Sequence, residues 1–280
     1  MDETLAAHVR ALRRGGVRAV RAAQALFELL CESDDNVDLI VVAGAIPPLV
    51  ALVCNGSDGK EEAACALASL ACKSDIAAQW IVDAGGIAAL VELLRDGSDD
   101  GKEEAACALA SLAYKGDIAA QSIVDAGGIA ALVELLRDDS DDGKEQAACA
   151  LGNLSSAGDA YDAMIAEAGA IEPLVELERN GSDDAKESAT RALDTLAFNS
   201  DFEAAVAAAR RRVAPAVEPS TEPPNLTTCI ACEDAARSVV FLPCAHACFC
   251  ESCAATHRAT SARCPICRTA ITGFVPFRLA

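Results

Sequence analysis

Aromatic residues make up only 4% of this 280-residue chain, although 52% of its residues are apolar. The core of a β-sandwich draws on aromatic and β-branched side chains, so this composition argues against that fold. Alanine and leucine are strong helix formers, and a core made of them favours helices packed closely side by side.

Basic residues are also few, since 23 Lys and Arg face 43 Asp and Glu, for a formal net charge of −20. Residues 215–280 hold five Arg and five acids, so the excess negative charge lies in residues 1–214. A surface this acidic repels phosphate, which disfavours general nucleic-acid binding and binding to anionic membranes. The same acidic surface attracts basic partners.

Long uncharged apolar runs are absent, and none approaches the roughly 18 residues that span a bilayer. The N-terminal segment carries five arginines and has no apolar core of signal-peptide length. These arginines are Arg10, Arg13, Arg14, Arg18 and Arg21. The fourteen cysteines are therefore expected to be reduced, in a cytoplasmic protein or in the nucleus.

What the first 212 residues do contain is internal repetition. The sequence KEEAACALASLA occurs twice, and Ile87, Ile129 and Ile171 recur every 42 residues. We predict about five units, over residues 1–44, 45–85, 86–127, 128–169 and 170–212. The two outermost units diverge most, as the capping units of a repeat array do.

Each unit predicts three helices. Asp117 is expected to cap a short first helix that ends near Asp125 and is broken by Gly127. Apolar residues at helical spacing mark the other two helices. These are Ile129, Leu132, Val133, Leu135 and Leu136 in the second helix, and Ala147, Ala148, Leu151 and Leu154 in the third. The acidic turn at residues 138–143 favours the start of the third helix.

The period, the Ala-Gly-Gly/Ala-Ile junction and the closing Ala-Leu-x-x-Leu resemble the armadillo repeat family over residues 1–212. Ankyrin and tetratricopeptide arrays have shorter periods, whereas HEAT repeats remain an alternative. The resemblance implies an all-α right-handed superhelical solenoid. In that fold the third helices line a concave groove that binds a protein.

An asparagine ladder in the armadillo groove can clamp an extended peptide. Of the equivalent positions here, Glu28, Ser69, Ser111, Asn153 and Thr195, only Asn153 matches, and the preceding tryptophan positions hold Cys65, Cys107, Cys149 and Arg191. An importin-like carrier is therefore disfavoured. We predict that a protein substrate contacts Glu62, Ser69, Glu104, Ser111 and Asn153, with Lys73 and Lys115 on the same helix faces. The recurrent cysteines are expected to be small helix fillers.

Residues 213–228, VAPAVEPSTEPPNLTT, contain four prolines and no helical period. Such a stretch predicts an extended linker that reaches roughly 50 Å. The preceding Arg210, Arg211 and Arg212 are expected to complement the negative end of a helix.

Residues 229–280 carry eight cysteines and two of the three histidines. Thiolate and imidazole are ligands that zinc prefers, and two-residue gaps let two sulfurs reach one metal. Eight positions complete two tetrahedra: Cys229, Cys232, Cys244, His246, Cys250, Cys253, Cys264 and Cys267. Cys248 could replace Cys250, but only Cys250 keeps the two-residue gap to Cys253. His257 is expected to face solvent.

This ligand order resembles the RING finger, because a PHD finger would place its histidine fifth and His246 is fourth. The resemblance implies a small zinc-stabilised α+β domain with cross-braced sites. Cys229, Cys232, Cys250 and Cys253 then hold the first Zn²⁺, and Cys244, His246, Cys264 and Cys267 hold the second. Both sites are closed, so the metals are structural. Residues 239–242 are expected to form a strand.

The RING resemblance implies a ubiquitin ligase that binds a ubiquitin-conjugating enzyme charged with ubiquitin. Ile230, Ala231, Leu242, Pro265 and Ile266 occupy the loops that contact that enzyme. Arg268 stands at the linchpin position, where a guanidinium restricts the thioester to attack geometry without any nucleophile. Ala231 departs from the usual Ile or Val. The alternative is a non-catalytic scaffold whose RING only docks partners.

The end of the chain is similar to the RINGs of inhibitor-of-apoptosis proteins, which dimerise through a short apolar tail. Here the tail carries Ile271 and Phe277, with Phe277 one position away from the usual aromatic. The resemblance therefore allows a homodimer through the RING. Residues 275–277 closing the core of the domain is the other interpretation.

Overall fold

The computed structural model describes residues 3–56, 58–137, 140–213, 239–242, 247–249, 251–260, 263, 271 and 273–276. The chain divides into two compact units, Met1–Val213 and Ala214–Ala280. The described part of the first unit is helical, and the described part of the second unit holds a three-stranded sheet and one helix. The predicted fold class, a helical solenoid followed by a small mixed domain, is confirmed.

The helices of the first unit repeat in threes. The first helices are α3 (Asp35–Val42), α6 (Asp75–Asp83), α9 (Asp117–Asp125) and α12 (Asp159–Glu167). The second helices are α4 (Ile46–Asn55), α7 (Gly86–Asp96), α10 (Gly128–Leu135) and α13 (Ile171–Asn180). The third helices are α5 (Lys60–Lys73), α8 (Asp99–Tyr114), α11 (Asp141–Ala157) and α14 (Asp183–Phe198). A helix pair, α1 (Glu3–Arg14) and α2 (Val17–Glu32), precedes them, and α15 (Ser200–Val213) follows.

Glycines and serines set the helix boundaries. Four glycines at the junctions between first and second helices share a φ between 73° and 78°, a left-handed conformation that favours glycine. They are Gly44, Gly85, Gly127 and Gly169. Ser98 and Ser140 cap the third helices α8 and α11 by accepting backbone hydrogen bonds. The prediction that Asp117 caps α9 is wrong, because Gly116 holds the cap position and Asp117 begins the helix.

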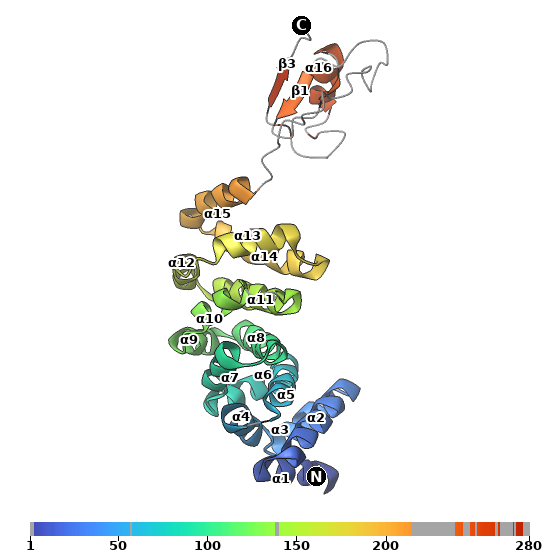
Figure 1. Cartoon of the computed structure of the whole chain (residues 1–280), viewed down its shortest axis with the longest axis vertical. Helices are drawn as coiled ribbons and strands as arrows, with labels where there is room; N and C mark the ends of the chain where they lie inside the picture. Colours follow the sequence, from blue (N-terminus) through green and yellow to red (C-terminus); the bar gives the residue numbers. More distant parts are fainter. Residues whose placement is uncertain are drawn as a thin grey trace. The chain divides into compact units, whose positions relative to one another are not determined.

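The core of this unit lies between consecutive third helices, which follow one another along the array (Figure 1). The predicted inward set on α11 is at most 1% exposed, and the predicted stripe on the second helix is buried as well. Small residues allow the close approach. A β-carbon on Gly152 would lie only 3.3 Å from the Ala192 Cα on α14. Alanine-rich helices therefore pack nearly backbone to backbone.

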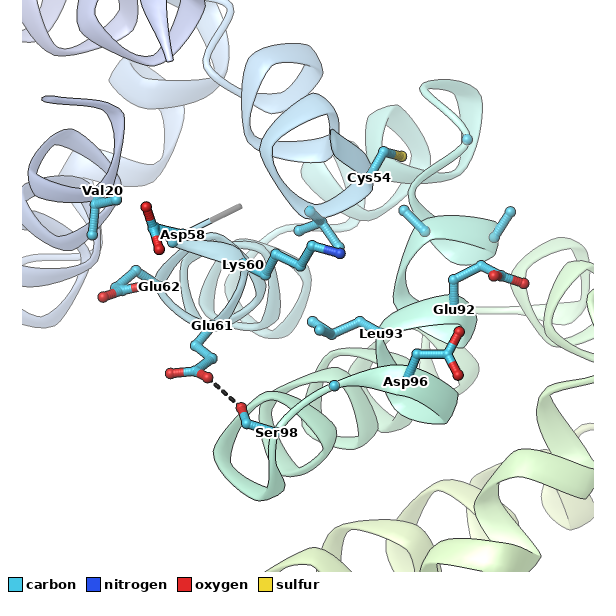
Figure 2. A pocket seen from close by; sticks show the side chains of 16 residues that line it. Val20, Cys54, Asp58, Lys60, Glu61, Glu62, Glu92, Leu93, Asp96 and Ser98 are labelled. Carbon is cyan, nitrogen blue, oxygen red and sulfur yellow. Dashed lines mark hydrogen bonds between the residues drawn. The ribbon is translucent and has the colours of Figure 1, made fainter. Parts of the chain in front are cut away.

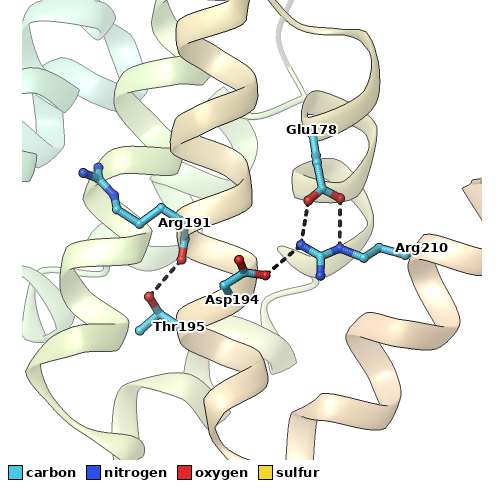
Figure 3. Close-up of polar contacts among 5 residues, drawn as sticks. All are labelled: Glu178, Arg191, Asp194, Thr195 and Arg210. Atoms are coloured by element: carbon cyan, nitrogen blue, oxygen red, sulfur yellow. Dashed lines mark hydrogen bonds and ion pairs between the residues drawn. The ribbon is translucent and has the colours of Figure 1, made fainter. Parts of the chain in front are cut away.

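Helix α15 closes the array through charged contacts. Arg210 donates two hydrogen bonds to Glu178 on α13, at 2.9 and 2.6 Å, and one to Asp194 on α14 at 3.0 Å (Figure 3). The hydrogen bonds to Glu178 raise the pKa of Arg210. Arg212 pairs with Glu172 at 3.2 Å. The arginines lie in the last turn of α15, and Arg210 also links it to two other helices.

No single helix in the described ranges is both long and apolar enough to cross a bilayer. In three places, two neighbouring helices together reach that length and composition, but a bend of 76° to 79° separates the two helices of each pair.

The second unit contains strands β1 (Val239–Leu242), β2 (Ala247–Phe249) and β3 (Gly273–Pro276) and helix α16 (Glu251–Thr260). Both outer strands pair antiparallel with β1, in the order β2-β1-β3. The strand predicted at residues 239–242 is confirmed. Three described side chains of the second unit are buried: Val239 on β1, Phe249 on β2 and Ala254 on α16. Strand β3 pairs with β1, so residues 273–276 form one edge of the sheet.

Candidate functional site

Helix α2 and the third helices α5 and α8 border a hollow of about 400 Å³. Its lining comprises Gln24, Phe27, Glu61, Glu62, Cys65, Asp100, Glu103 and Glu104. The structure thus brings together two of the predicted substrate contacts, Glu62 and Glu104, from adjacent repeats. Ser69, Ser111 and Asn153 are half-buried further along α5, α8 and α11, and they do not line this hollow.

The hollow is strongly acidic. Burial raises the pKa of Glu103, and the nearby Asp142 and Glu104 raise it further. Burial also raises the pKa of Glu104, with Asp100 adding to the effect. Both shifts mean that the charged carboxylate is disfavoured there by lost hydration and by like charge. A cation placed among these groups would relieve both.

The thiols of the groove are of two kinds. Cys65 shares a hydrogen bond with Glu104, and burial raises the pKa of its thiol far above the usual range. Burial raises the pKa of Cys107 to about 11. Neither is a thiolate at neutral pH, so neither is a reactive nucleophile. Cys149 differs because the Arg191 Nη2 atom lies 3.0 Å from its sulfur.

Asn153 is committed to an internal contact. Its Nδ2 donates a hydrogen bond of 2.9 Å to the carbonyl oxygen of Ala110 on α8. The amide that resembles the peptide-clamping ladder therefore links two adjacent third helices. The equivalent positions hold Ser69 and Ser111, whose short side chains cannot form a ladder of amides.

Lys73 and Lys115 also make contacts between helices. Lys73 Nζ contacts the Leu30 carbonyl oxygen at 2.7 Å and Asp34 at 2.6 Å. Lys115 pairs with Asp75 at 2.8 Å. Neither lysine lines the acidic hollow, so the hollow keeps its negative charge.

Of the eight predicted zinc ligands, Cys253 lies within the described residues, half-buried in the first turn of α16. The other seven, Cys229, Cys232, Cys244, His246, Cys250, Cys264 and Cys267, lie outside the described residues. So do Ile230, Ala231, Pro265, Ile266 and Arg268, the predicted contacts of the conjugating enzyme. Leu242 ends β1, where it pairs with Gly273. Seven thiols and one imidazole are the donor set that zinc prefers, so the residues present fit that metal.

The structure corrects the expectation for His257. The ring lies 4.9 Å from the ring of Phe249, centroid to centroid, and its Nε2 is 2.9 Å from the carbonyl oxygen of Arg263. His257 is therefore half-buried and holds α16 against β2. Helical periodicity alone could not reveal this contact, because Phe249 belongs to a different element.

These features together define a helical-repeat protein with a cysteine-rich, zinc-binding module. The family described as "Armadillo/beta-catenin-like repeat" matches residues 33–72, 74–114 and 119–156. The family described as "Zinc finger, C3HC4 type (RING finger)" matches residues 225–274. The chain is an armadillo-repeat protein with a C3HC4-type RING finger near its C-terminus. Zinc binding follows from that finger.

Known proteins resemble the two parts separately. E3 ubiquitin-protein ligase MGRN1 of Mus musculus is 43% identical over 54 residues, or 19% of this chain and 9% of its own length. Probable E3 ubiquitin-protein ligase LUL4 of Arabidopsis thaliana is 38% identical over 53 residues, 19% of this chain and 15% of its own length. The match therefore spans only a small part of these relatives.

Solved structures resemble the array. The designed armadillo repeat protein YIII(Dq)4CqI has a TM-score of 0.70 at 27% identity, covering 79% of this chain and 93% of that one. An engineered protein, target OR366, has a TM-score of 0.70 at 34% identity, covering 75% and 87%.

Proposed function

We propose that this chain is a RING-type ubiquitin-protein ligase whose armadillo array recruits a protein substrate. The observation that carries the proposal is the C3HC4 RING finger at residues 225–274, similar to the RINGs of named ubiquitin ligases, on the same chain as an armadillo array. Joining the two parts raises the effective concentration of a bound substrate near the charged conjugating enzyme. Reduced thiols suit the cytoplasm or the nucleus.

In this proposal the RING holds two zinc ions, each with four protein ligands. Cys229, Cys232, Cys250 and Cys253 hold one, and Cys244, His246, Cys264 and Cys267 hold the other. When bound, the metals cross-link the loops and thereby stabilise a fold too small for an apolar core alone. Their closed coordination leaves catalysis to the docked conjugating enzyme.

The cross-linked loops present an apolar surface to the conjugating enzyme, formed by Ile230, Ala231, Leu242, Pro265 and Ile266. Arg268 follows the last ligand. Its planar guanidinium can hydrogen-bond to the conjugating enzyme and to ubiquitin at once. This restricts the thioester to a geometry in which a substrate lysine attacks it, and ubiquitin passes from sulfur to the lysine nitrogen.

The substrate-binding part of the proposal centres on the acidic hollow between α2, α5 and α8. The raised pKa values of Glu103 and Glu104 indicate that a cation there would be stabilised. We infer that a basic segment of the substrate lies in the groove. A designed armadillo repeat protein solved in complex with peptide (KR)4 is 27% identical to this chain, with a TM-score of 0.68.

A panel of ubiquitin-charged conjugating enzymes tests the ligase proposal on the purified full chain. We expect autoubiquitination with at least one enzyme. Arg268→Ala should lower its rate on the order of tenfold at unchanged zinc content, because it removes charge-assisted hydrogen bonds. Arg268→Lys should restore only part of the rate. No product with any enzyme would contradict the ligase and favour a scaffold.

The scaffold alternative rests on Ala231, where similar RINGs carry a larger Ile or Val. A smaller side chain would weaken docking of the conjugating enzyme. If this residue alone limits activity, Ala231→Ile should increase the rate of autoubiquitination. If neither the unchanged chain nor the Ala231→Ile variant shows autoubiquitination, the result would support the scaffold.

A further inference from the structure

Hollows recur between successive members of the helix series α1, α4, α7, α10 and α13. They measure about 590 Å³ at α1/α4, 760 Å³ at α4/α7, 710 Å³ at α7/α10 and 640 Å³ at α10/α13. In three of the four, an arginine near or just after the end of the earlier helix of the pair lines the hollow. These are Arg13, Arg95 and Arg137. The α4/α7 hollow is the exception among the described residues.

Arg95 shows what the arginine does. Its Nη2 donates to the carbonyl oxygens of Ala126 and Gly127, at 3.0 and 3.3 Å, and its Nη1 pairs with Glu92 at 3.1 Å. The guanidinium thus caps the carbonyl end of α9 at the left-handed glycine. A β-carbon on Gly127 would lie 2.6 Å from Arg95 Nη2.

The same placement recurs at two other junctions. A β-carbon on Gly169 would lie 3.3 Å from Arg137 Nη2, and one on Gly44 would lie 3.8 Å from Arg13 Nη2. Arg137 also pairs with the glutamate three residues before it, as Arg95 does. An arginine and a left-handed glycine therefore lie close together at three of the four junctions.

The α4/α7 junction has the glycine but not the arginine. Gly85 has a φ of 75°, against 76° for Gly127, so the turn is the same. Cys54 stands at the arginine position, and Ala51 replaces the glutamate three residues before it. Apart from its chain neighbours, no described atom lies within 4 Å of a β-carbon placed on Gly85. The guanidinium place at this junction is open.

The α4/α7 hollow is lined by carboxylates, whose negative charge attracts a guanidinium. Figure 2 shows the lining, with Cys54 and Lys60 from α4 and α5, and Glu92 and Asp96 from α7. Asp58, Glu61 and Glu62 add three further carboxylates. Lys60 does not replace the arginine, because Lys102 and Lys144 line the equivalent hollows together with Arg95 and Arg137.

The geometry points to the α4/α7 hollow as a binding site for an arginine side chain of a protein partner. That side chain supplies at Gly85 the guanidinium that the chain itself supplies at the other three junctions. Its planar fork suits two adjacent carbonyl oxygens and a carboxylate, which a lysine ammonium matches less well. Glu61 and Glu62 line both the α4/α7 hollow and the acidic hollow between α2, α5 and α8. Cys54 and Gly85 line only the first of these two hollows.

Titration of the ¹⁵N-labelled full chain with the capped peptide Gly-Gly-Arg-Gly-Gly tests the site by amide chemical shifts. We expect saturable shifts at Gly85 and Gly86, about tenfold weaker binding for the lysine peptide and none for the neutral citrulline peptide. Cys54→Ser should keep the response. Cys54→Arg should abolish it, because the chain then fills its own hollow. Equal binding of the lysine peptide, or no shift at Gly85, overturns the proposal.

The converse variant keeps the proposal testable if Cys54→Arg fails to fold. Arg95→Ala opens the same place at the α7/α10 junction, so the arginine peptide should also shift Gly127 and Gly128. Arg95→Lys should do so less. If Arg95→Ala leaves Gly127 unresponsive, the open junction does not take an arginine and the proposal fails. These readouts do not depend on ubiquitin transfer, so they stand apart from the ligase proposal.

Discussion

The array and the RING finger achieve rigidity by different means. In the array each third helix buries alanine and leucine against the next, so the core extends from unit to unit. In the RING the described core consists of Val239, Phe249 and Ala254 around a short sheet. A domain of about 50 residues rarely stabilises itself with so little apolar burial. Loss of the metal and loss of core packing should therefore destabilise different parts of the chain.

Removing zinc should give the largest effect, confined to the RING. Structural zinc contributes roughly 10–16 kcal/mol in small zinc-folded peptides. Chelation should therefore abolish ubiquitin transfer while the helical signal of the array persists. Elemental analysis and far-ultraviolet circular dichroism measure both, and we expect about two zinc ions per chain.

Two cysteine variants sharpen this test. Cys253→Ser should lower the zinc content, whereas Cys149→Ser on α11 should leave it unchanged. A metal-free RING that stays folded and active would remove the distinction between the two regions.

A cavity in the array core should have the next largest effect. Leu109 on α8 is fully buried between repeats. Leu109→Ala should lower the free energy of unfolding of the array by about 2–5 kcal/mol, as measured by denaturant titration. Ile118→Ala, at a side chain 66% exposed, should cost less than about 0.5 kcal/mol. Zinc release in Leu109→Ala would show that the two regions are coupled.

Loss of the α15 clamp should destabilise the end of the array locally. Arg210→Ala removes three charge-assisted hydrogen bonds, and partial exposure limits the cost to about 1 kcal/mol. Amide hydrogen exchange in α15 should accelerate more than in α8. Arg212→Ala should do less, because that side chain is 69% exposed, against 35% for Arg210. Equal acceleration in both variants would argue against the clamp.

The acidic hollow should give the smallest effect and a distinctive pH dependence. Glu103 and Glu104 have a raised pKa in the folded array, so the folded state binds protons more tightly than the unfolded state. Stability should therefore fall as the pH rises from the ordinary carboxyl pKa of 4.5 through the raised values.

Neutralising this charge should flatten the pH profile. Glu104→Gln should stabilise the array at pH 7 by a few tenths of a kcal/mol, since the group is only partly buried. It should also weaken binding of a basic peptide. Glu187→Gln, at the exposed position on α14 equivalent to Glu103, is the matched control and should change neither. A profile in Glu104→Gln that falls as steeply with pH as that of the unchanged chain would contradict this origin, because only Glu103 then remains of the two groups.

The repeat period and the buried sets followed from the sequence because they depend on contacts repeated within each unit. The 42-residue spacing, the inward Ala147 and Leu151, and the strand at residues 239–242 are all present. The helix caps did not follow in the same way. Asp75 and Asp117 are the first helical residues of α6 and α9, and the cap position before them holds Ser74 in one repeat and Gly116, without a side-chain cap, in the next.

Groove contacts were harder to predict. Asn153, Lys73 and Lys115 lie on helix faces where sequence spacing suggests a ligand-binding role. Their partners, such as the carbonyl oxygens of Ala110 and Leu30, belong to neighbouring helices. Backbone acceptors leave no trace in a residue pattern, so these internal contacts could not be read from it.

By itself the sequence determined the armadillo array, its helical period and the zinc-binding RING finger, because each of these is written in residue types at fixed spacings. Only the tertiary structure decided which polar groups remain available to a partner. It turned Asn153 inward, drew the carboxylates of α5 and α8 into one hollow, and left Gly85 without the arginine that its sister junctions have. The physical reason is that a polar side chain bonds to whatever donor or acceptor packing brings within about 3 Å, and packing joins residues from different repeats.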